Sequence, residues 1–524
     1  PADHVNRPWR NWKLREIAMS LRGLYPVPMR SPLLLLPCLL VGLVFPSSAQ
    51  EDLAERMENA IALLRSSGQA DPSAIAMMLS SAAEGYIQKE DYGTALARIQ
   101  ESIALSRKHD LDPTMPFFTA SKILSKTDEE AAKQFLLREV TAPGTSNAYK
   151  KGVLKALDLH LALHGDQQLA IQAAHESLRL TKQENPGSEE EFHALYRYAT
   201  HCLSAKLYDI AGPALREAKE LAIALGKTQL AAHCARSIGF ALVAEREPEQ
   251  ALGHFREALQ YIRRSGEDTF LFFELSNIAA AELELGRLDQ AAATIEQAVA
   301  AARNEMEEGI ARSLLAVLEL KRGVAGGGTP DWSSVIEHQE AAVAAKRKND
   351  AAGEEMALLG ATQDLLALAA YEVLAGEAEQ AEATLAIARR GIGAWEANIR
   401  TARQSAVFSA DQVNLSLSSL HGGLSEIEQR VHLAGDDRDA ALVAAENGRG
   451  AAQAALMREK LGLPATEQAA KNLTRDDIVR IAGENDTTLV VYSVAHPFAA
   501  GTRRFFRLGD PEVPPATLYA WVVS

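Results

Sequence analysis

The stretch VAEREPEQALGHFREALQYI (Val243–Ile262) recurs in outline about 40 residues later as LELGRLDQAAATIEQAVAAA (Leu283–Ala302). Each copy has a short polar turn, then an alanine, an apolar residue one helical turn on, and a small residue one turn beyond. In the first copy these are Ala251, Phe255 and Ala258. The pattern predicts two antiparallel helices joined by a tight turn, with small residues where the two backbones approach most closely.

The same arrangement recurs along most of the chain. We identify each copy by the alanine near the start of its second helix, and successive alanines lie about 40 residues apart. One gap of about two periods holds a degenerate copy around Trp332–Lys348. A single hairpin cannot bury its apolar stripe alone, so the repeat predicts a stacked helical solenoid. The anchoring alanines are Ala95, Ala131, Ala170, Ala211, Ala251, Ala291 and Ala381, with Ala440 as a weaker eighth.

The clearest copy shows how the two helices of a hairpin fit together. We expect Gly239 to let the helices approach, Ile238 and Phe255 to fill the space beside it, and Arg246-Glu247-Pro248 to form the turn. At these residues the chain resembles tetratricopeptide repeats of the longer-period variety. That resemblance implies an inner face that binds peptide segments of partner proteins. The alternative, a generic alanine-rich helical bundle, has no reason to keep a fixed period.

Composition narrows the classes of partner and of covalent chemistry. The 524 residues carry a formal net charge of -15, which disfavours nucleic acid as a general partner. Three cysteines are too few for a disulfide framework. Cys202 and Cys234 fall in consecutive first helices with an offset of about 12 Å along the helix axis, beyond disulfide reach. We therefore predict two buried thiols.

The N-terminal segment has the pattern of an export signal. Arg30 precedes the apolar run Leu33–Phe45, and small residues follow up to Ala49. The run is too short to span a bilayer, and its prolines argue against a buried helix. Met29–Gln50 therefore predicts a secretory signal peptide cut after Ala49, with the residues before it an upstream extension. Cys38 follows a proline, the wrong residue for a lipoprotein anchor site.

Motifs that would carry catalysis or bind a cofactor are missing from the sequence. There is no Cys-x-x-Cys pair, no His-Glu-x-x-His and no Gly-x-Ser-x-Gly, so we expect no cofactor and no metal. His160 and His164 share a helix face, and we interpret them as surface or partly packed residues. His193 and His233 fall early in consecutive first helices, where this type of repeat has its groove. We predict them as candidate groove residues, able to contact an acidic partner segment or simply solvated.

The end of the chain changes from helical to strand-like patterning. TTLVVYSVA (Thr487–Ala495) and TLYAWVVS (Thr517–Ser524) are rich in β-branched and aromatic residues, and RRFFRL (Arg503–Leu508) is a weaker third candidate. Such apolar strands suit an α/β sheet covered on both faces. Two or three strands alone would leave an open apolar edge. We therefore expect the chain to stop just inside a second domain.

This junction resembles the start of CHAT domains. AAENGRGAAQAALM (Ala444–Met457), a linker and the two strands carry the resemblance, although the segment Ala495–Ala516 is longer than the usual hairpin. CHAT domains are caspase-like α/β peptidase domains that typically follow tetratricopeptide repeats in bacteria. The resemblance implies that the catalytic His and Cys lie beyond residue 524. No residue of this chain inherits those roles.

The sequence thus predicts a mainly α protein, an α-solenoid followed by the first strands of a caspase-like domain. The expected domains are 1–49 (extension and signal peptide), 50–462 (helical repeats), 463–486 (linker) and 487–524 (start of the α/β domain). The expected function is the partner-binding, regulatory portion of an exported, periplasmic or secreted CHAT-type peptidase. The alternative is a non-catalytic interaction scaffold with a degenerate C-terminal module. A cytosolic repeat regulator would conflict with the signal segment.

Overall fold

The computed structural model describes residues 53–66, 71–126, 128–164, 166–266, 268–348, 354–404, 410–448, 474–484, 489–495 and 517–523. The predicted signal peptide, the candidate strand at 503–508 and most of the predicted linker lie outside these ranges. The described residues fall into two compact units that divide between Gly226 and Lys227. We describe each unit by itself.

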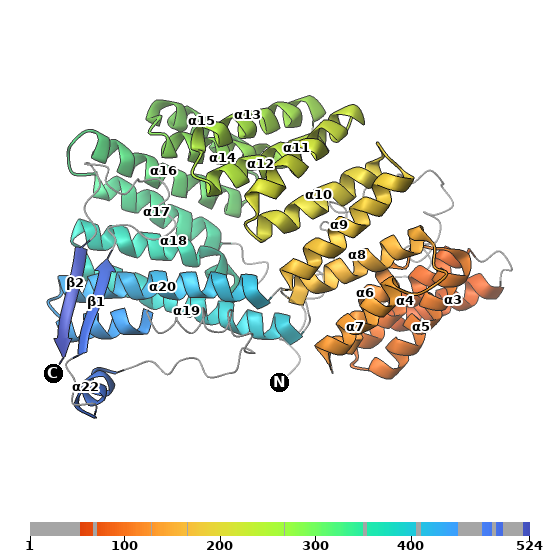
Figure 1. The fold of residues 1–524 in the computed structure, drawn as a ribbon. Coiled ribbons are helices and arrows are strands. Elements are labelled where there is room, and N and C mark those ends of the chain that lie inside the picture. Colours follow the sequence, from red (N-terminus) through yellow and green to blue (C-terminus); the bar gives the residue numbers. More distant parts are fainter. Residues whose placement is uncertain are drawn as a thin grey trace. The chain divides into compact units, whose positions relative to one another are not determined.

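The first unit is entirely helical in its described residues (Figure 1). After α3, the helices pair in chain order as the hairpins α4–α5, α6–α7, α8–α9 and α10–α11. The helices are α3 (Leu53–Ser66), α4 (Pro72–Gln88), α5 (Tyr92–His109), α6 (Thr114–Ser125), α7 (Glu129–Val140), α8 (Asn147–His164), α9 (Gln167–Glu184), α10 (Glu189–Ser204) and α11 (Tyr208–Ala224).

The second unit continues with the same hairpins. The degenerate copy predicted around Trp332–Lys348 is the second helix of the hairpin α16–α17. The helices are α12 (Thr228–Ala244), α13 (Pro248–Ser265), the 3-10 turn η1 (Asp268–Phe270), α14 (Leu271–Glu284), α15 (Leu288–Ala301), α16 (Glu305–Ala325), α17 (Trp332–Arg347), α18 (Glu354–Ala375), α19 (Ala378–Gln404), α20 (Ala410–Ala434), a helical segment at 438–448, and α22 (Arg475–Glu484).

Helix capping corrects two of the predicted anchors. Asp128 caps α7 by accepting a hydrogen bond from the backbone N–H of Ala131, which is exposed, whereas the next residue, Ala132, is fully buried. Asp437 accepts from the N–H of Ala440 in the same way, and the fully buried residue is the one after it. The residue four positions after the cap faces the first helix, so the anchors in these two copies shift by one residue.

The packing of the clearest hairpin follows the sequence prediction. Gly239 of α12 lies so close to Phe255 of α13 that a Cβ atom on the glycine would meet the ring at 2.5 Å. Ile238, Phe255 and Ala251 are all buried. Arg246 adopts a left-handed φ of 66° in the turn between the helices. The small residue at 239 therefore sets the distance between the two helices.

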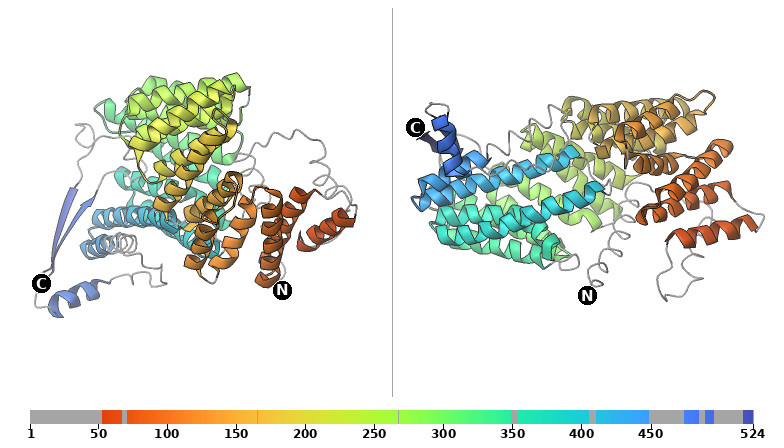
Figure 2. Two further views of the ribbon diagram at one scale, coloured as in Figure 1. Left: turned by 45° about the vertical axis from the view of Figure 1, so that its right-hand side comes forward. Right: turned by 90° about the horizontal axis from the view of Figure 1, so that it is seen from below.

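Two strands close the second unit. β1 (Leu489–Ala495) and β2 (Thr517–Val523) pair antiparallel with Val491 opposite Trp521, so the long insertion does not prevent their pairing. Figures 1 and 2 show them side by side next to α22. Ser493 Oγ donates to Gln429 Oε1 of α20 at 2.8 Å, and Trp521 Nε1 donates to the carbonyl oxygen of Arg438 at 3.2 Å. The predicted strands thus form a hairpin attached to the last helices.

Candidate partner-binding site

One histidine of the predicted pair and both helical cysteines are part of the core. His160 is buried, so its interpretation as a surface or partly packed residue was wrong; the helix face that carries it turns inward. Cys202 and Cys234 are buried thiols, as predicted. Burial also raises the pKa of Cys202, which keeps this thiol protonated. In the described part of the chain, no three His, Cys, Asp or Glu side chains are grouped to hold a metal ion.

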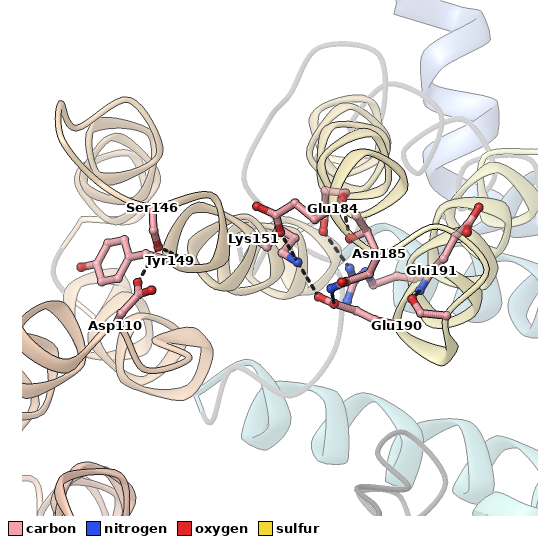
Figure 3. Close-up of polar contacts among 12 residues, drawn as sticks. Asp110, Ser146, Tyr149, Lys151, Glu184, Asn185, Glu190 and Glu191 are labelled. Carbon is pink, nitrogen blue, oxygen red and sulfur yellow. Dashed lines mark hydrogen bonds and ion pairs between the residues drawn. The ribbon is translucent and has the colours of Figure 1, made fainter.

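In the first unit, the junction between α9 and α10 is held by a buried lysine of α8 (Figure 3). Lys151 Nζ lies 2.8 Å from Glu184 Oε2 and 2.9 Å from Glu190 Oε1. Asn185 donates to the other oxygen of Glu190 at 3.1 Å. Because the lysine ammonium is buried and paired twice, it fixes the end of α9 to the start of α10.

The next turn of α10 positions the first predicted groove residue. Ser188 caps the helix by accepting from the N–H of Glu191, and the Glu191 carboxylate accepts from the N–H of Gly187 at 2.6 Å. His193 follows one turn later with its ring partly exposed. Its Nε2 lies 3.9 Å from Glu189 Oε1, and its ring packs edge-on against Phe192. His193 therefore lies on an accessible surface beside a carboxylate.

A second group of buried charges joins α8 to α10. Asp158 of α8 is buried, lies 2.9 Å from Arg197 Nε, and is also paired with His201. Lys155, one turn before Asp158, makes no ion pair with any other described residue. Burial lowers the pKa of Lys155, partly offset by the carboxylate of Asp112. Asp158 thus forms ion pairs with Arg197 and His201 between the two helices.

The first unit also contains a pocket of about 600 Å³, a size that suits a small molecule. Arg107 Nη2 lies 2.6 Å from Glu139 Oε2, and its guanidinium lies 5.8 Å from the centre of the Tyr149 ring. The Tyr149 hydroxyl is buried and has no regular hydrogen-bond partner among the described residues. Its burial raises the pKa of this tyrosine, while the charge of Arg107 acts in the opposite direction. The lining residues are Arg107, Asp110, Glu139, Ala142, Pro143, Gly144, Thr145, Ser146 and Tyr149.

In the second unit, the other predicted groove residue belongs to an aromatic cluster. The ring of His233 in α12 meets Phe270 edge-on at 5.1 Å, and the guanidinium of Arg236 stacks 4.8 Å from the same ring. Arg236 also pairs with Glu274 of α14, which is buried. Burial, with a smaller contribution from Arg236, lowers the pKa of His233 to about 4. This imidazole is therefore neutral at physiological pH.

Two aromatic side chains beside this cluster face solvent. Phe240 is 50% exposed and lies on the same stripe of α12 as His233 and Arg236, while Phe273 at the start of α14 is 41% exposed. We call His233, Arg236, Phe240, Phe270 and Phe273 the aromatic face. The sequence pointed to His233 through the repeat period. It gave no reason to separate the exposed Phe240 from a core residue such as Phe255.

His193 and His233 hold equivalent positions in α10 and α12, but these helices belong to different units. The structure therefore places each histidine on its own surface, with different neighbours. Each ring packs edge-on against a phenyl ring, but His193 has a carboxylate beside it whereas His233 has an arginine. Whether both contact a partner stays a prediction.

Comparison with known proteins finds the helical architecture and nothing more specific. No protein family matches the sequence, and neither does any curated protein. Among solved structures, the apo form of RapI is similar at 12% identity and a TM-score of 0.44, covering 67% of this chain and 94% of RapI. The Rap conjugation gene regulator of plasmid pLS20, in complex with the Phr* peptide, is 14% identical with a TM-score of 0.38, covering 75% and 99%.

A signal transduction ATPase from Pyrococcus horikoshii with a tetratricopeptide repeat sensor is 12% identical with a TM-score of 0.39, covering 69% of this chain and 56% of that one. Similarity at this level concerns the fold alone. None of the helices that the structure describes combines the length and apolar character needed to span a bilayer. The described residues form tetratricopeptide-like helical hairpins and one two-stranded β-hairpin.

Proposed function

We propose that the aromatic face of the second unit binds segments of partner proteins. The observation that carries this proposal is the exposure of Phe240 and Phe273 on consecutive first helices. Half-exposed phenyl rings grouped on a soluble protein mark interaction surfaces, because their burial by a partner is a large favourable term. Aromatic side chains are also enriched at the energetic centres of interfaces.

The electrostatics of this face favour an apolar segment over an acidic one. His233 is neutral at pH 7, and Glu274 already neutralises Arg236. A partner carboxylate would therefore compete with Glu274 for Arg236. Apolar or aromatic side chains of a partner can bind without disrupting the Arg236–Glu274 ion pair. The neutral imidazole of His233 remains able to form a hydrogen bond with the partner.

Peptide selection combined with hydrogen exchange tests this function. Random dodecapeptides selected on the chain are expected to be rich in apolar and aromatic residues. Addition of a selected peptide is expected to slow amide exchange in α12 and α14, with α13 and α15 as internal controls. A selection that enriches no peptide, or protection that excludes α12 and α14, would contradict the proposal.

A similar role is proposed for His193 in the first unit. Its partly exposed ring lies beside Glu189, so it would suit a partner group that donates a hydrogen bond or carries positive charge. The change His193→Ala is expected to lower the affinity of selected peptides that bind the first unit. It should not change the affinity of peptides that bind the aromatic face.

We also propose that β1 and β2 begin a caspase-like peptidase domain regulated by the repeats. The support is the pairing of two apolar strands and their attachment to α20 and the 438–448 segment through Ser493 and Trp521. Expression of the gene through its stop codon, followed by an assay for thiol-dependent peptide cleavage, tests this. A complete product without a Cys/His pair would support the non-catalytic scaffold instead.

Export is proposed on the pattern of Met29–Gln50 alone. N-terminal sequencing of protein from the native host is expected to find a mature chain that begins near Gln50. Protein that retains Met29 in the cytoplasm would contradict the proposal.

A further inference from the structure

Two hairpins of the second unit contain the same buried glutamate with different surroundings. In the first, Glu282 of α14 is buried, and each of its oxygens has a partner. Arg256 Nη2 of α13 lies 2.8 Å from Oε1, and Thr294 Oγ1 of α15 donates to Oε2 at 2.7 Å. The carboxylate is therefore compensated by one cation and one hydroxyl.

In the second, Glu372 of α18 is 4% exposed and keeps only the hydroxyl. Thr384 Oγ1 of α19 donates to Glu372 Oε1 at 3.0 Å. The other oxygen, Oε2, is buried without a hydrogen-bond partner among the described residues. The helices α13 and α17 align when the buried residue Ala251 is matched with the buried residue Val335. In this alignment, Glu340 of α17 occupies the position of Arg256 in α13. The arginine of α13, which precedes the first of these hairpins, is thus replaced by a carboxylate in α17, which precedes the second.

This replacement leaves an acidic slot formed by Glu340, Glu372 and Thr384. Glu340 is exposed, and in the other hairpin Arg256 reaches the carboxylate with 47% of its side chain still exposed. The rim from which a cation reaches the buried glutamate is therefore open to solvent. Burial raises the pKa of Glu372, and the charges of Glu340 and Glu377 add to this, whereas the hydrogen bond from Thr384 lowers it.

We propose that the acidic slot receives an arginine side chain of a partner segment, in the position that Arg256 takes in the sibling hairpin. A guanidinium supplies the donors that Glu372 Oε2 lacks and pairs with both carboxylates. The proposal rests on partner binding by the repeats and adds a second contact with its own chemistry. The slot lies among α17, α18 and α19, whereas the aromatic face lies on α12, η1 and α14.

The first test uses Nα-acetyl-arginine methylamide as the probe, titrated into the protein and followed by ligand-detected NMR. We expect saturable binding that is at least about tenfold tighter than that of the neutral isostere Nα-acetyl-citrulline methylamide, because one lost charged contact of 1.4 kcal/mol corresponds to tenfold. Glu372→Gln is expected to remove this preference. Equal binding of both probes, or equal binding to the variant, would overturn the proposal.

The second test rebuilds the sibling arrangement without any ligand. Glu340→Arg is expected to raise Tm by about 2–4 °C and to abolish binding of the arginine probe. Glu337→Arg, on the same helix and also exposed, is the matched control for the change in charge. A Glu340→Arg variant no more stable than this control would contradict the proposal. Phe240→Ala should not alter probe binding, which separates this outcome from a failure of the aromatic face.

Discussion

The two units use the same hairpin but differ in what their first helices present. In the first unit, α8 and α10 bury charges that satisfy each other, such as Lys151 with Glu190 and Asp158 with Arg197. In the second, α12 and α14 share one buried pair and leave Phe240 and Phe273 exposed. Charged groups that already pair with each other gain little from a partner, whereas covering exposed aromatic rings makes a favourable contribution to the binding free energy. The comparison favours a structural role for the buried charges of α8 and α10, and the exposed rings of α12 and α14 support the binding role proposed for the second unit.

The largest expected effect on stability distinguishes the buried Phe255 from the half-exposed Phe240. Phe255→Ala should lower the free energy of unfolding by about 3–5 kcal/mol, because it leaves a cavity against Gly239. Phe240→Ala, on the adjacent helix, should cost far less because half of that ring is already in water. Urea denaturation of both variants measures the difference. Equal costs would mean that Phe240 is a core residue and would remove the proposed binding face.

Acid pH tests the electrostatics of the aromatic face. The pKa of His233 is lowered to about 4, so the folded state binds its proton less readily than the unfolded state does. Its contribution to stability is therefore present above the ordinary value near 6.5 and is lost as pH falls from there towards 4, by at most about 3 kcal/mol. His233→Asn should remove this part of the pH dependence between pH 7 and 4.

Buried glutamates act in the opposite direction over that range. Burial raises the pKa values of Glu274 and Glu372, so their contribution is present below the ordinary value near 4.5 and is lost as pH rises through the folded-state pKa. The difference between wild type and His233→Asn isolates the histidine. Identical pH profiles for the two proteins would show that His233 is solvated.

A smaller effect is expected at the charged junction of the first unit. Lys151→Met should cost about 2–3 kcal/mol, below the range for a fully buried pair, because Glu184 and Glu190 are themselves partly exposed. Arg179→Met is the control, since its pair with Glu176 at 2.6 Å lies within α9 and is exposed on both sides, so its loss should change the free energy of unfolding little. If the two changes cost the same, the junction is no more structural than the surface.

The repeat period predicted the hairpins, but two of its anchors were off by one residue. The pairs Ala131–Ala132 and Ala440–Ala441 offer two alanines each, and only the position of the capping aspartate decides which one faces inward. The burial of His160 was missed because a histidine on an amphipathic helix reads as a polar-face residue. Its inward direction depends on which neighbouring helices cover it.

The candidate sites were only partly visible in the sequence. The period singled out His233, yet the pKa of His233 is lowered mainly by its burial, and Phe270, whose ring packs against it, comes from a later element of the chain. Aligning the repeats does reveal Glu340 in place of Arg256. Only the burial of Glu372 shows that this replacement leaves a carboxylate oxygen without a partner.

The most direct test of the central claim is the affinity of a selected peptide for the double variant Phe240→Ala/Phe273→Ala, measured by fluorescence anisotropy. The control is Val299→Ala, which removes an exposed apolar side chain from a second helix, α15. We expect the double variant to lose at least about 2 kcal/mol of binding free energy, roughly thirtyfold in Kd, while it stays folded with a melting temperature well above that of Phe255→Ala. The control should bind like wild type. A double variant that keeps its affinity would contradict a binding role for the aromatic face.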